Sequence, residues 1–550
     1  MLDTAAKDLK RLRHIVGTVM KYGYGSVIGK APELSAAATE LAPVQATTAN
    51  TPAPRRFRMM LEELGPTFIK LGQVLSTRPD LVGPEIAREL TRLQSDAPAD
   101  PPADIRATIE EELGKPIAEL FAEFEDVPLA SASIAQVHRA RLHSGEDVVV
   151  KVQHKGIAGK ILPDLDILAG LAELGENHSM QLRSYQPIAV VRQFRRTLLR
   201  ELDFTFERQY LEEFTEHFRA DPTVHFPRAY PALSSRRVLT MERLHGVLGN
   251  DTAALAASGA DLNAFARHGA QMYLEMIFRD GFYHADPHPG NLMLLPGGVV
   301  GVLDCGMVGR LDESLGEAVE DMLMAVVNPS SADLAEILLR LGSVPPEAPR
   351  DQLRADVTDF VSDFTRQSIQ EMELGAALSS LFEIIRRHNI TLPAPLSLLL
   401  RTLIELEGTA QQLSPEFNLA EVIKPFYLSM MRRRFAPKRI LGRLQHAYRD
   451  WERLVEALPR DIGDVLKRVR DGTFSVHLDH QRLDPIVNRL VLGVMNAALV
   501  VGSSLLWSMR APPVVADISV FGAAGYLFSA YLFWRLLRAI RKSGDITPKK

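Results

Sequence analysis

Tyr283–Gly306 reads YHADPHPGNLMLLPGGVVGVLDCG, and the fold that we expect for the chain rests on these residues. The first half carries His284, Asp286 and Asn291 in the spacing H-x-D-x-x-x-x-N. Two apolar runs joined by Pro-Gly-Gly follow, which predicts a β-hairpin that ends at Asp304. The segment is therefore either an ordinary irregular loop between strands or a loop that carries a catalytic carboxylate and metal ligands.

Two prolines exclude a helical metal site in this loop. Pro287 and Pro289 flank His288, and a proline inside a helix removes a hydrogen bond and clashes with the preceding turn. His284 and His288 therefore do not form an i, i+4 metal-binding pair on a helix.

The pattern resembles the catalytic loop and the metal-binding turn of the protein-kinase fold. In such a site the Asp286 carboxylate would orient a hydroxyl group or a water molecule. Asn291 and Asp304 would supply hard oxygen ligands for Mg²⁺ beside the triphosphate of ATP. We therefore expect ATP and Mg²⁺ as cofactors, Asp286 as a catalytic residue, and Asn291 and Asp304 as metal ligands.

The region before this loop predicts a small β-sheet. Residues 128–140 read PLASASIAQVHRA, a Ser-Gly turn follows, and residues 147–152 read DVVVKV, so strands alternate with tight turns. A loop of alanine and serine lets backbone N–H groups approach phosphates closely, at a place where kinases usually have glycine. The expected ATP-binding residues of this region are Ala130, Ser131, Ala132, Ser133, Ile134, Ala135, Gln136 and Val137.

Lys151 lies in a valine-rich strand, where a buried charge requires an acidic partner. Its place corresponds to the lysine that holds the α- and β-phosphates in kinases. The helix expected over residues 190–216 contains Glu201, Asp203 and Glu207 within two turns, a set that is also typical of a solvated helix face. We choose Glu207 as the catalytic partner of Lys151, with Glu201 as the second choice.

The segment after this helix is expected to join two lobes. Val238–Gly246 reads VLTMERLHG, a strand followed by a connector, and the backbone at Glu242 is expected to pair with adenine. The helix expected over residues 261–279 then leads the chain into the catalytic loop.

Two features argue against a kinase that acts on peptides. Ala285 stands where protein kinases have the arginine that binds activation-loop phosphate, and the chain becomes helical by about Asp312. This leaves almost no activation segment on which a peptide could dock. A phosphotransferase that acts on lipids or small molecules, or an ATPase, agrees better with these residues.

Composition sets limits on the partners and the location of the chain. Its 550 residues are enough for two or three domains. A single cysteine, Cys305, excludes an internal disulfide and indicates a reducing compartment. The net charge of −5 gives no reason to expect nucleic acid as a partner, and the first residues do not read as a secretory signal.

Three further segments have a distinctive composition. Residues 2–20 combine an apolar stripe with basic residues, so this amphipathic helix either rests on an anionic membrane or packs on the domain. Residues 31–56 are rich in Ala, Thr and Pro and predict a flexible linker. The run MMRRRFAPKR at 430–439 either faces lipid head groups or lies in a solvated turn.

The C-terminal part is far more apolar than the rest and predicts two membrane-spanning helices. Leu490–Trp507 contains no charged residue, and Val514–Trp534 contains only Asp517. Each segment is about long enough to cross a bilayer, although buried helices of a soluble domain have a similar composition. Basic residues flank the two outer ends, which predicts a multi-pass anchor with the catalytic part in the cytoplasm.

Taken together, these residues resemble the UbiB family of atypical kinases, which is linked with ubiquinone (coenzyme Q) biosynthesis. The resemblance covers residues 55–540 and rests on several motifs in a fixed order. They are Lys70-Leu71-Gly72-Gln73, the Ala-rich loop, Lys151, Glu201-x-Asp203, HADPHPGN, Asp304-Cys305-Gly306 and the two apolar segments.

The resemblance assigns a regulatory role to the K-x-G-Q helix, which would fold over the active site. Lys70 and Gln73 would be regulatory together with Glu201 and Asp203, the acids that Lys70 would contact. A lysine at this place would keep a peptide hydroxyl out of the cleft while it neutralises nearby carboxylates.

The resemblance also implies ATP hydrolysis coupled to the handling of isoprenoid quinone precursors at the bacterial inner membrane. The expected partners are membrane lipid, these precursors and other quinone-biosynthesis enzymes. Two alternatives stay open: a lipid or small-molecule phosphotransferase, and a non-catalytic scaffold that binds nucleotide and organises membrane enzymes.

We therefore expect an α+β, atypical protein-kinase-like fold of two lobes, with an N-terminal helical extension and a C-terminal transmembrane helix hairpin. The expected parts are residues 1–30 (amphipathic helix), 31–56 (linker), 57–125 (helical extension with K-x-G-Q), 126–245 (N-lobe), 246–345 (C-lobe with the catalytic loop), 346–484 (helical region) and 486–536 (two transmembrane helices).

Overall fold

The computed structural model describes residues 2–24, 51–93, 98–178, 186–327, 331–342, 350–365, 374–388, 390–434, 483–515 and 518–542. The chain divides into two compact units, Met1–Arg439 and Ile440–Lys550. Most of the linker expected at 31–56, part of the basic run at 430–439, and Asp517 lie outside the described residues.

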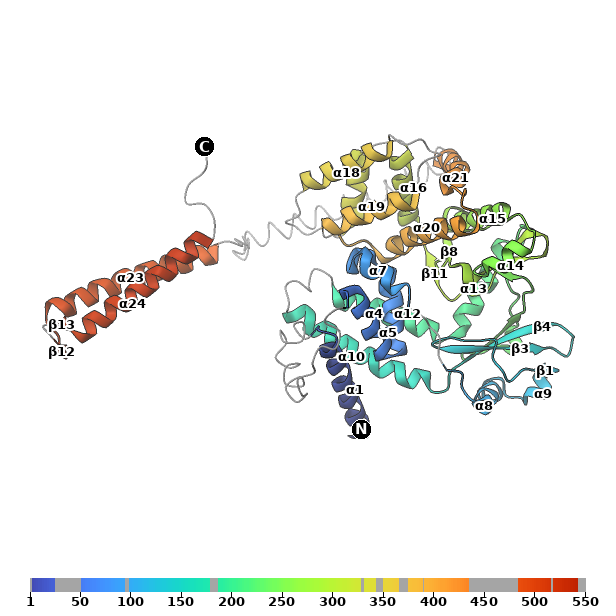
Figure 1. The fold of residues 1–550 in the computed structure, drawn as a ribbon, viewed down its shortest axis with the longest axis horizontal. Helices are drawn as coiled ribbons and strands as arrows, with labels where there is room; N and C mark the ends of the chain where they lie inside the picture. Colours follow the sequence, from blue (N-terminus) through green and yellow to red (C-terminus); the bar gives the residue numbers. More distant parts are fainter. Residues whose placement is uncertain are drawn as a thin grey trace, which may run out of the picture. The chain divides into compact units, whose positions relative to one another are not determined.

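The first unit contains an antiparallel sheet with the strand order β1-β3-β4-β6, and β2 also pairs with β3. Figure 1 labels β1, β3 and β4 of this sheet. The strands are β1 (Glu123–Phe124), β2 (Ala130–Ser131), β3 (Ala135–Arg141), β4 (Asp147–Gln153) and β6 (Val238–Glu242). Strands and turns therefore alternate here as the sequence predicts.

The two faces of β4 have different roles because side chains alternate along a strand. Val148, Val150 and Val152 are buried on one face, in a core with residues of α8 (Pro102–Leu113) and α9 (Ile117–Leu120). Lys151 has the opposite parity and therefore faces away from this core. It lies between Val137 of β3 and Leu239 of β6 in the strand register.

The helix expected over residues 190–216 is two helices. They are α12 (Pro187–Glu201) and α13 (Phe204–His217). The break occurs at Asp203, whose backbone is extended and whose side chain accepts a hydrogen bond from the amide of Thr205 at 3.1 Å. An aspartate favours this N-cap position because it satisfies an amide that has no partner within the helix.

The C-lobe places the catalytic loop between two short strands. After α14 (Thr252–Ala257) and α15 (Leu262–Glu275), a π-helical turn (Met276–Asp280) leads into β8 (Phe282–His284). The loop then contains a 3₁₀ turn at Pro289–Asn291 and enters the hairpin of β9 (Leu292–Leu295) and β10 (Val299–Val302). The pairs β5 (Val224–His225) with β10, β7 (Val247–Leu248) with β9, and β11 (Val308–Arg310) with β8 complete these sheets.

A set of helices follows the metal-binding turn. They are α16 (Glu313–Val327), α17 (Ser331–Leu341), α18 (Arg350–Thr365), α19 (Leu374–Arg387), α20 (Ala394–Leu413) and α21 (Leu419–Arg434). Leu396, Leu399 and Leu403 of α20 are buried in one core with Phe265 and Tyr273 of α15. The helical region and the C-lobe therefore share a core.

The N-terminal extension packs on the N-lobe side of this unit (Figure 1). Its helices are α1 (Leu2–Lys21), α4 (Ala53–Leu64), α5 (Pro66–Ser76), α6 (Pro79–Val82) and α7 (Pro84–Leu90), and α10 (Ile157–His178) packs beside them. Ile15 and Val16 of α1 are buried, and Arg11 pairs with Asp164 of α10 at 2.6 Å. Of the two roles considered for this amphipathic helix, packing on the domain is the one that the contacts support.

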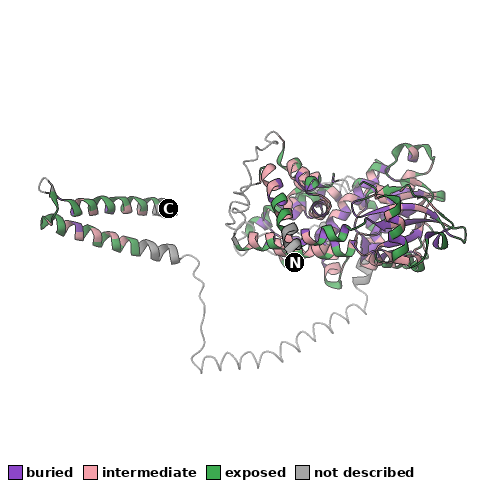
Figure 2. Cartoon of the chain, turned by 90° about the horizontal axis from the view of Figure 1, so that it is seen from below, coloured by how far each residue is buried: buried purple, intermediate pink, exposed green. Residues whose placement is uncertain are grey.

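The second unit contains two helices that pack against each other, α23 (Leu483–Ser508) and α24 (Val520–Lys542), joined through β12 (Val514–Val515) and β13 (Ile518–Ser519). Within the described residues, Val491–Ser508 is the one helical segment long and apolar enough to cross a membrane. The second expected span does not meet this criterion. Large apolar side chains such as Val494, Leu505 and Phe521 are exposed, and Figure 2 shows the described parts of both helices as largely exposed.

Candidate active site

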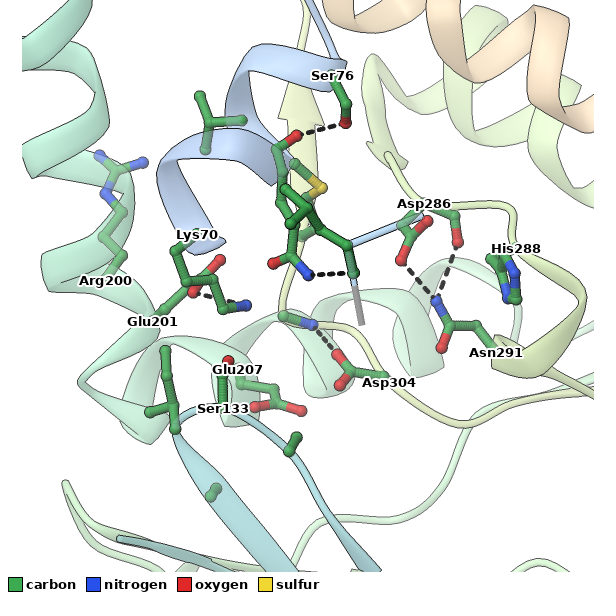
Figure 3. Close-up of a pocket in the computed structure, with 18 of the residues that line it drawn as sticks. Lys70, Ser76, Ser133, Arg200, Glu201, Glu207, Asp286, His288, Asn291 and Asp304 are labelled. Atoms are coloured by element: carbon green, nitrogen blue, oxygen red, sulfur yellow. Dashed lines mark hydrogen bonds and ion pairs between the residues drawn. The ribbon is translucent and has the colours of Figure 1, made fainter. Parts of the chain in front are cut away.

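A cavity of about 480 Å³ lies against the catalytic loop, the metal-binding turn, the Ala-rich loop and the helical extension (Figure 3). Its lining comes from helices α5, α7, α12, α13 and α20, strands β3 and β4, and the loops beside them. The expected site residues in this lining are Lys70, Gln73, Ala132, Ser133, Ile134, Ala135, Lys151, Glu201, Asp203, Glu207, Asp286, Asn291 and Asp304. Segments far apart in the sequence therefore meet at one cavity.

Lys151 forms the centre of the charged cluster in this cavity. Its ammonium group contacts Glu207 Oε1 at 2.8 Å and Asp304 Oδ2 at 3.1 Å. Glu207 lies in the first turn of α13, the helix that Asp203 caps, and its side chain is buried. The pair expected between Lys151 and Glu207 is present.

The two carboxylates that contact Lys151 have pKa values shifted in opposite directions. Burial raises the pKa of Glu207 to about 7 against the attraction of Lys151, and the charge of Asp304 adds to the rise. Partial burial also opposes ionisation of Asp304, but Lys151 and the N–H of Gly306 hold the pKa of its carboxyl well below the ordinary value. The pKa of Lys151 lies above its ordinary value because these two acids outweigh the effect of its own burial.

Asp286 and Asn291 are joined within the catalytic loop. The Asn291 amide nitrogen donates to Asp286 Oδ2 at 2.9 Å and to the Asp286 carbonyl at 3.2 Å (Figure 3). Because the nitrogen is held in this way, the Asn291 side-chain oxygen is the atom left to act as a ligand.

His284 connects the catalytic loop to the metal-binding turn. Its Nδ1 accepts a hydrogen bond from the Asp286 amide at 3.3 Å, so its Nε2 carries the proton and donates to the Asp304 carbonyl at 2.5 Å. The Tyr273 hydroxyl lies 3.0 Å from the same Nδ1. The histidine of the H-x-D motif therefore fixes backbone positions.

The Ala-rich loop is held from the end of β4. His154 is buried, and its Nε2 lies 2.8 Å from the Ala132 carbonyl. Asp100, which precedes α8, lies 3.2 Å from the other ring nitrogen of His154 and accepts from the Lys155 amide. These contacts fix the loop where its backbone reaches the cavity.

The K-x-G-Q helix α5 covers one side of the cavity. Lys70 pairs with Glu201 at 3.0 Å, and the Gln73 amide donates to the Leu93 carbonyl at 3.3 Å. The ion pair of Asp203 is instead with Arg236, at 3.2 Å. A Cβ at Gly72 would lie 2.3 Å from the Leu93 side chain, so this helix needs glycine to pack closely.

Several expected nucleotide-binding residues do not line the cavity. The Glu242 amide donates to the Arg228 carbonyl and its carboxylate pairs with His225 at 3.0 Å, so its N–H is not free for adenine. This corrects the expectation for Glu242. The others that lie outside the lining are Ala130 and Ser131 in β2, and Gln136 and Val137 in β3.

Sequence reasoning missed two charged residues of α20. Arg401 and Glu405 line the cavity and pair with each other at 2.5 Å. The available signal was an i, i+4 pair of charges inside the otherwise apolar helix Ala394–Leu413.

The side-chain oxygens available in the cavity suit Mg²⁺ bound together with a nucleotide better than a metal ion bound by the protein alone. Among the described residues, no group of three or more His, Cys, Asp or Glu side chains could hold a metal by itself. Asn291 and Asp304 offer oxygen ligands, and Mg²⁺ in nucleotide sites takes one or two protein ligands plus phosphates and water. The residues therefore fit a metal that arrives with phosphates.

The lysine, its buried acid, the catalytic loop and the metal-binding turn define a kinase-like site. The chain matches the ABC1 atypical kinase-like domain over residues 92–338, the UbiB helical domain over 357–418 and the ABC1/UbiB kinase-like C-terminal domain over 478–542. The fold is thus an atypical kinase-like fold of mixed helix and sheet.

Relatives of known sequence cover most of the chain. A protein of Azotobacter vinelandii named "Probable protein kinase UbiB" is 34% identical over 84% of this chain and 85% of its own. The Synechocystis protein sll1770, described as uncharacterized, is 33% identical over 88% and 84%. A solved complex of Rv3197 with erythromycin from Mycobacterium tuberculosis is 23% identical over 66% of this chain and 93% of its own, with a TM-score of 0.44. The chain belongs to the ABC1/UbiB family.

Proposed function

We propose that this chain binds Mg-ATP in the cavity and hydrolyses it, and that this activity supports ubiquinone (coenzyme Q) biosynthesis at a membrane. The observation that carries the proposal is the convergence of Lys151, Glu207, Asp304, Asp286 and Asn291 on one cavity. Membership of the ABC1/UbiB family supports the link to ubiquinone.

Each residue of this set has a separate task. Lys151, held by Glu207, would bind the nucleotide phosphates, and the backbone of the loop at Ala132 would lie against them. Asn291 and Asp304 would hold Mg²⁺, which when bound neutralises negative charge on the phosphates. Asp286 would orient the attacking O–H group.

The lid formed by α5 and α7 favours a small nucleophile. Lys70, Gln73 and Leu90 line the cavity together with Asp286. We propose that the Lys70–Glu201 ion pair holds this lid over the cleft, so that Lys70, Gln73 and Glu201 regulate access. Asp203 would act indirectly, because it caps the helix that carries Glu207.

A second candidate function is transfer of phosphate to a lipid or small molecule. The cavity is lined not only by charges but also by the apolar side chains of Val74, Leu90, Leu93 and Met307. An apolar wall beside a carboxylate suits an amphipathic acceptor with a hydroxyl group.

We further propose that the tail anchors the protein in the bacterial inner membrane. Nothing among the described residues covers the exposed apolar side chains of α23 and α24, and lipid would do so. In this proposal both helices span the bilayer as a hairpin and the kinase-like domain lies in the cytoplasm. Membrane lipid, isoprenoid quinone precursors and other quinone-biosynthesis enzymes would then be the partners.

The proposed function is tested by the substitution Asp304→Asn in the purified full-length protein. We expect release of phosphate from Mg-ATP to fall at least a hundredfold, because the amide loses the charge that binds the metal. The matched control is Asp359→Asn, at an exposed position of α18, which should leave the rate unchanged.

The outcome also separates the candidate functions. Turnover by Asp304→Asn equal to that of the natural chain would exclude the metal site. Nucleotide binding without release or transfer of phosphate by the natural chain would instead favour the scaffold. Phosphate that appears on an added isoprenoid phenol or lipid, measured with labelled ATP, would favour the phosphotransferase.

A further inference from the structure

The helical region contributes an acid to the cavity that the kinase-like motifs do not account for. Glu405 of α20 lines the same cavity as Asp286 and Asn291. Its Oε1 is held by Arg401 at 2.5 Å. Its Oε2 is buried and has no hydrogen-bond partner among the described residues. A buried carboxylate oxygen of this kind requires a donor beyond the described residues, such as a water molecule in the cavity.

Glu405 and Asp286 line the same cavity, and their charges influence the same neighbouring groups. Burial raises the pKa of Glu405, the charge of Arg401 lowers it, and the charge of Asp286 raises it again. The pKa of the buried Tyr273 is raised mainly by its burial, and the negative charges of Asp286 and Glu405 add to this rise. The two carboxylates are therefore close enough to influence each other.

The relative position of the two acids is fixed by α20. Thr402 and Thr409 of this helix donate hydrogen bonds to the catalytic-loop carbonyls of Ala285 and Pro287, at 3.3 Å and 2.9 Å. Because the helix that carries Glu405 is bonded to the backbone on both sides of Asp286, neither acid can shift without the other.

We propose that Asp286 and Glu405 together bind the attacking water, so that the site favours hydrolysis over transfer to an alcohol. Water has two O–H groups and can donate one to each carboxylate, whereas an alcohol has one and leaves an acid without a donor. The inference rests on the ATP hydrolysis proposed above and adds the identity of the nucleophile and a second residue that binds it.

The reaction follows from this placement. The water oxygen forms a bond to the terminal phosphorus of ATP, the bond from that phosphorus to the bridging oxygen breaks, and ADP leaves with the electron pair. One water proton passes to Asp286. Glu405 keeps its hydrogen bond to the second O–H group, which orients the oxygen for attack.

The substitution Glu405→Gln tests this role. Arg401 offers only donors, so the new amide would turn its oxygen to Arg401 and its NH₂ group to the cavity, where it cannot accept from water. We expect phosphate release to fall about tenfold, with KM for Mg-ATP within about twofold. Glu416→Gln, an exposed acid after α20, is the matched control.

The decisive readout is the partition between water and an added alcohol. With glycerol present, the ratio of glycerol phosphate to inorganic phosphate should rise in Glu405→Gln, because only hydrolysis uses the second acceptor. Glu405→Asp keeps the charge and should give an intermediate ratio. Thermal unfolding with and without nucleotide verifies that each variant is folded and binds.

Three results would overturn the inference. An unchanged rate in folded Glu405→Gln would exclude a role for the carboxylate while leaving the proposed ATP hydrolysis intact. An equal loss of hydrolysis and transfer, with the ratio unchanged, would assign Glu405 to structure alone. If Asp304→Asn measured in parallel hydrolyses ATP normally, the proposed function itself fails, and the inference fails with it.

Discussion

Lys151 stands between two carboxylates of different character. Glu207 is buried, with 7% of its side chain exposed, whereas 49% of the Asp304 side chain is exposed. Burial raises and Lys151 lowers the pKa of both acids; burial outweighs the attraction for Glu207, whereas Asp304 stays ionised. We infer that Glu207 positions the lysine, and that the more open Asp304 is the acid available to a metal.

This difference predicts a pH dependence of stability. The pKa of Glu207 rises from 4.5 to about 7 in the folded chain. Between these values the folded state holds a proton that the unfolded chain has released, so Glu207 stabilises the fold at low pH and this contribution is lost as the pH rises through about 7. Replacement by Gln removes the titration, and the stability of Glu207→Gln relative to the natural chain should increase from pH 5 to pH 7.

Thermal unfolding at pH 5, 6, 7 and 8 measures this effect. Asp304 and Lys151 do not interfere in that range, because the pKa of the first is lowered and that of the second is raised. Glu216→Gln, at an exposed position of α13, serves as the control. Parallel pH curves for the natural chain and Glu207→Gln would contradict the raised pKa.

The lid formed by α5 and α7 is bonded to the helical region through the segment between these two helices. Arg78, which precedes α6, forms a bidentate pair with Asp80, through Nε at 3.0 Å and Nη2 at 2.7 Å. Its Nη2 also lies 3.3 Å from the Leu392 carbonyl, just before α20. Both side chains are nearly inaccessible to solvent. The lid thus contacts the helix that carries Glu405 through its neighbouring loop.

Breaking this buried pair should loosen the lid. In Arg78→Ala the Asp80 carboxylate stays buried without its cation, which we expect to destabilise the chain by about 3–5 kcal/mol. The double variant Arg78→Ala/Asp80→Ala leaves no unpaired charge and should be more stable than the single variant. Denaturant unfolding measures the two stabilities, and hydrogen exchange over residues 66–90 measures the loosening. Unchanged exchange over these residues in Arg78→Ala would exclude the fastening role.

The second unit differs from the first because many of its large apolar side chains are exposed. Val494, Met509 and Leu527 are more than half exposed, although comparable side chains in the first unit form its cores. Polar contacts lie instead between the helices, where Ser529 donates to Asn496 at 2.7 Å. Apolar side chains outside and polar contacts inside are the arrangement expected of helices in lipid.

Removal of residues 485–550 should therefore release the protein from membranes. We expect the shortened chain in the supernatant after ultracentrifugation, because the exposed apolar surface of the tail is gone. A chain that lacks only residues 543–550, which follow α24, should stay in the membrane fraction. Retention of the longer deletion in the membrane would assign the attachment to another part of the chain.

The amino-acid order alone was sufficient for features that depend on neighbouring residues. The spacing of Asp286 and Asn291, the valine-rich strand that carries Lys151, and the apolar run predicted at Leu490–Trp507 are local patterns with a direct structural meaning. The sequence also limited the partner of Lys151 to Glu207 or Glu201, because a buried cation needs an acidic partner.

Only the tertiary structure decided which long-range contacts are made. The break at Asp203 turns an expected single helix into two and separates the environments of Glu201 and Glu207. Glu242 engages its amide within the chain, and Glu405 reaches the cavity from a helix distant in sequence. Residue spacing describes one element at a time, whereas these contacts depend on how separate helices and strands pack.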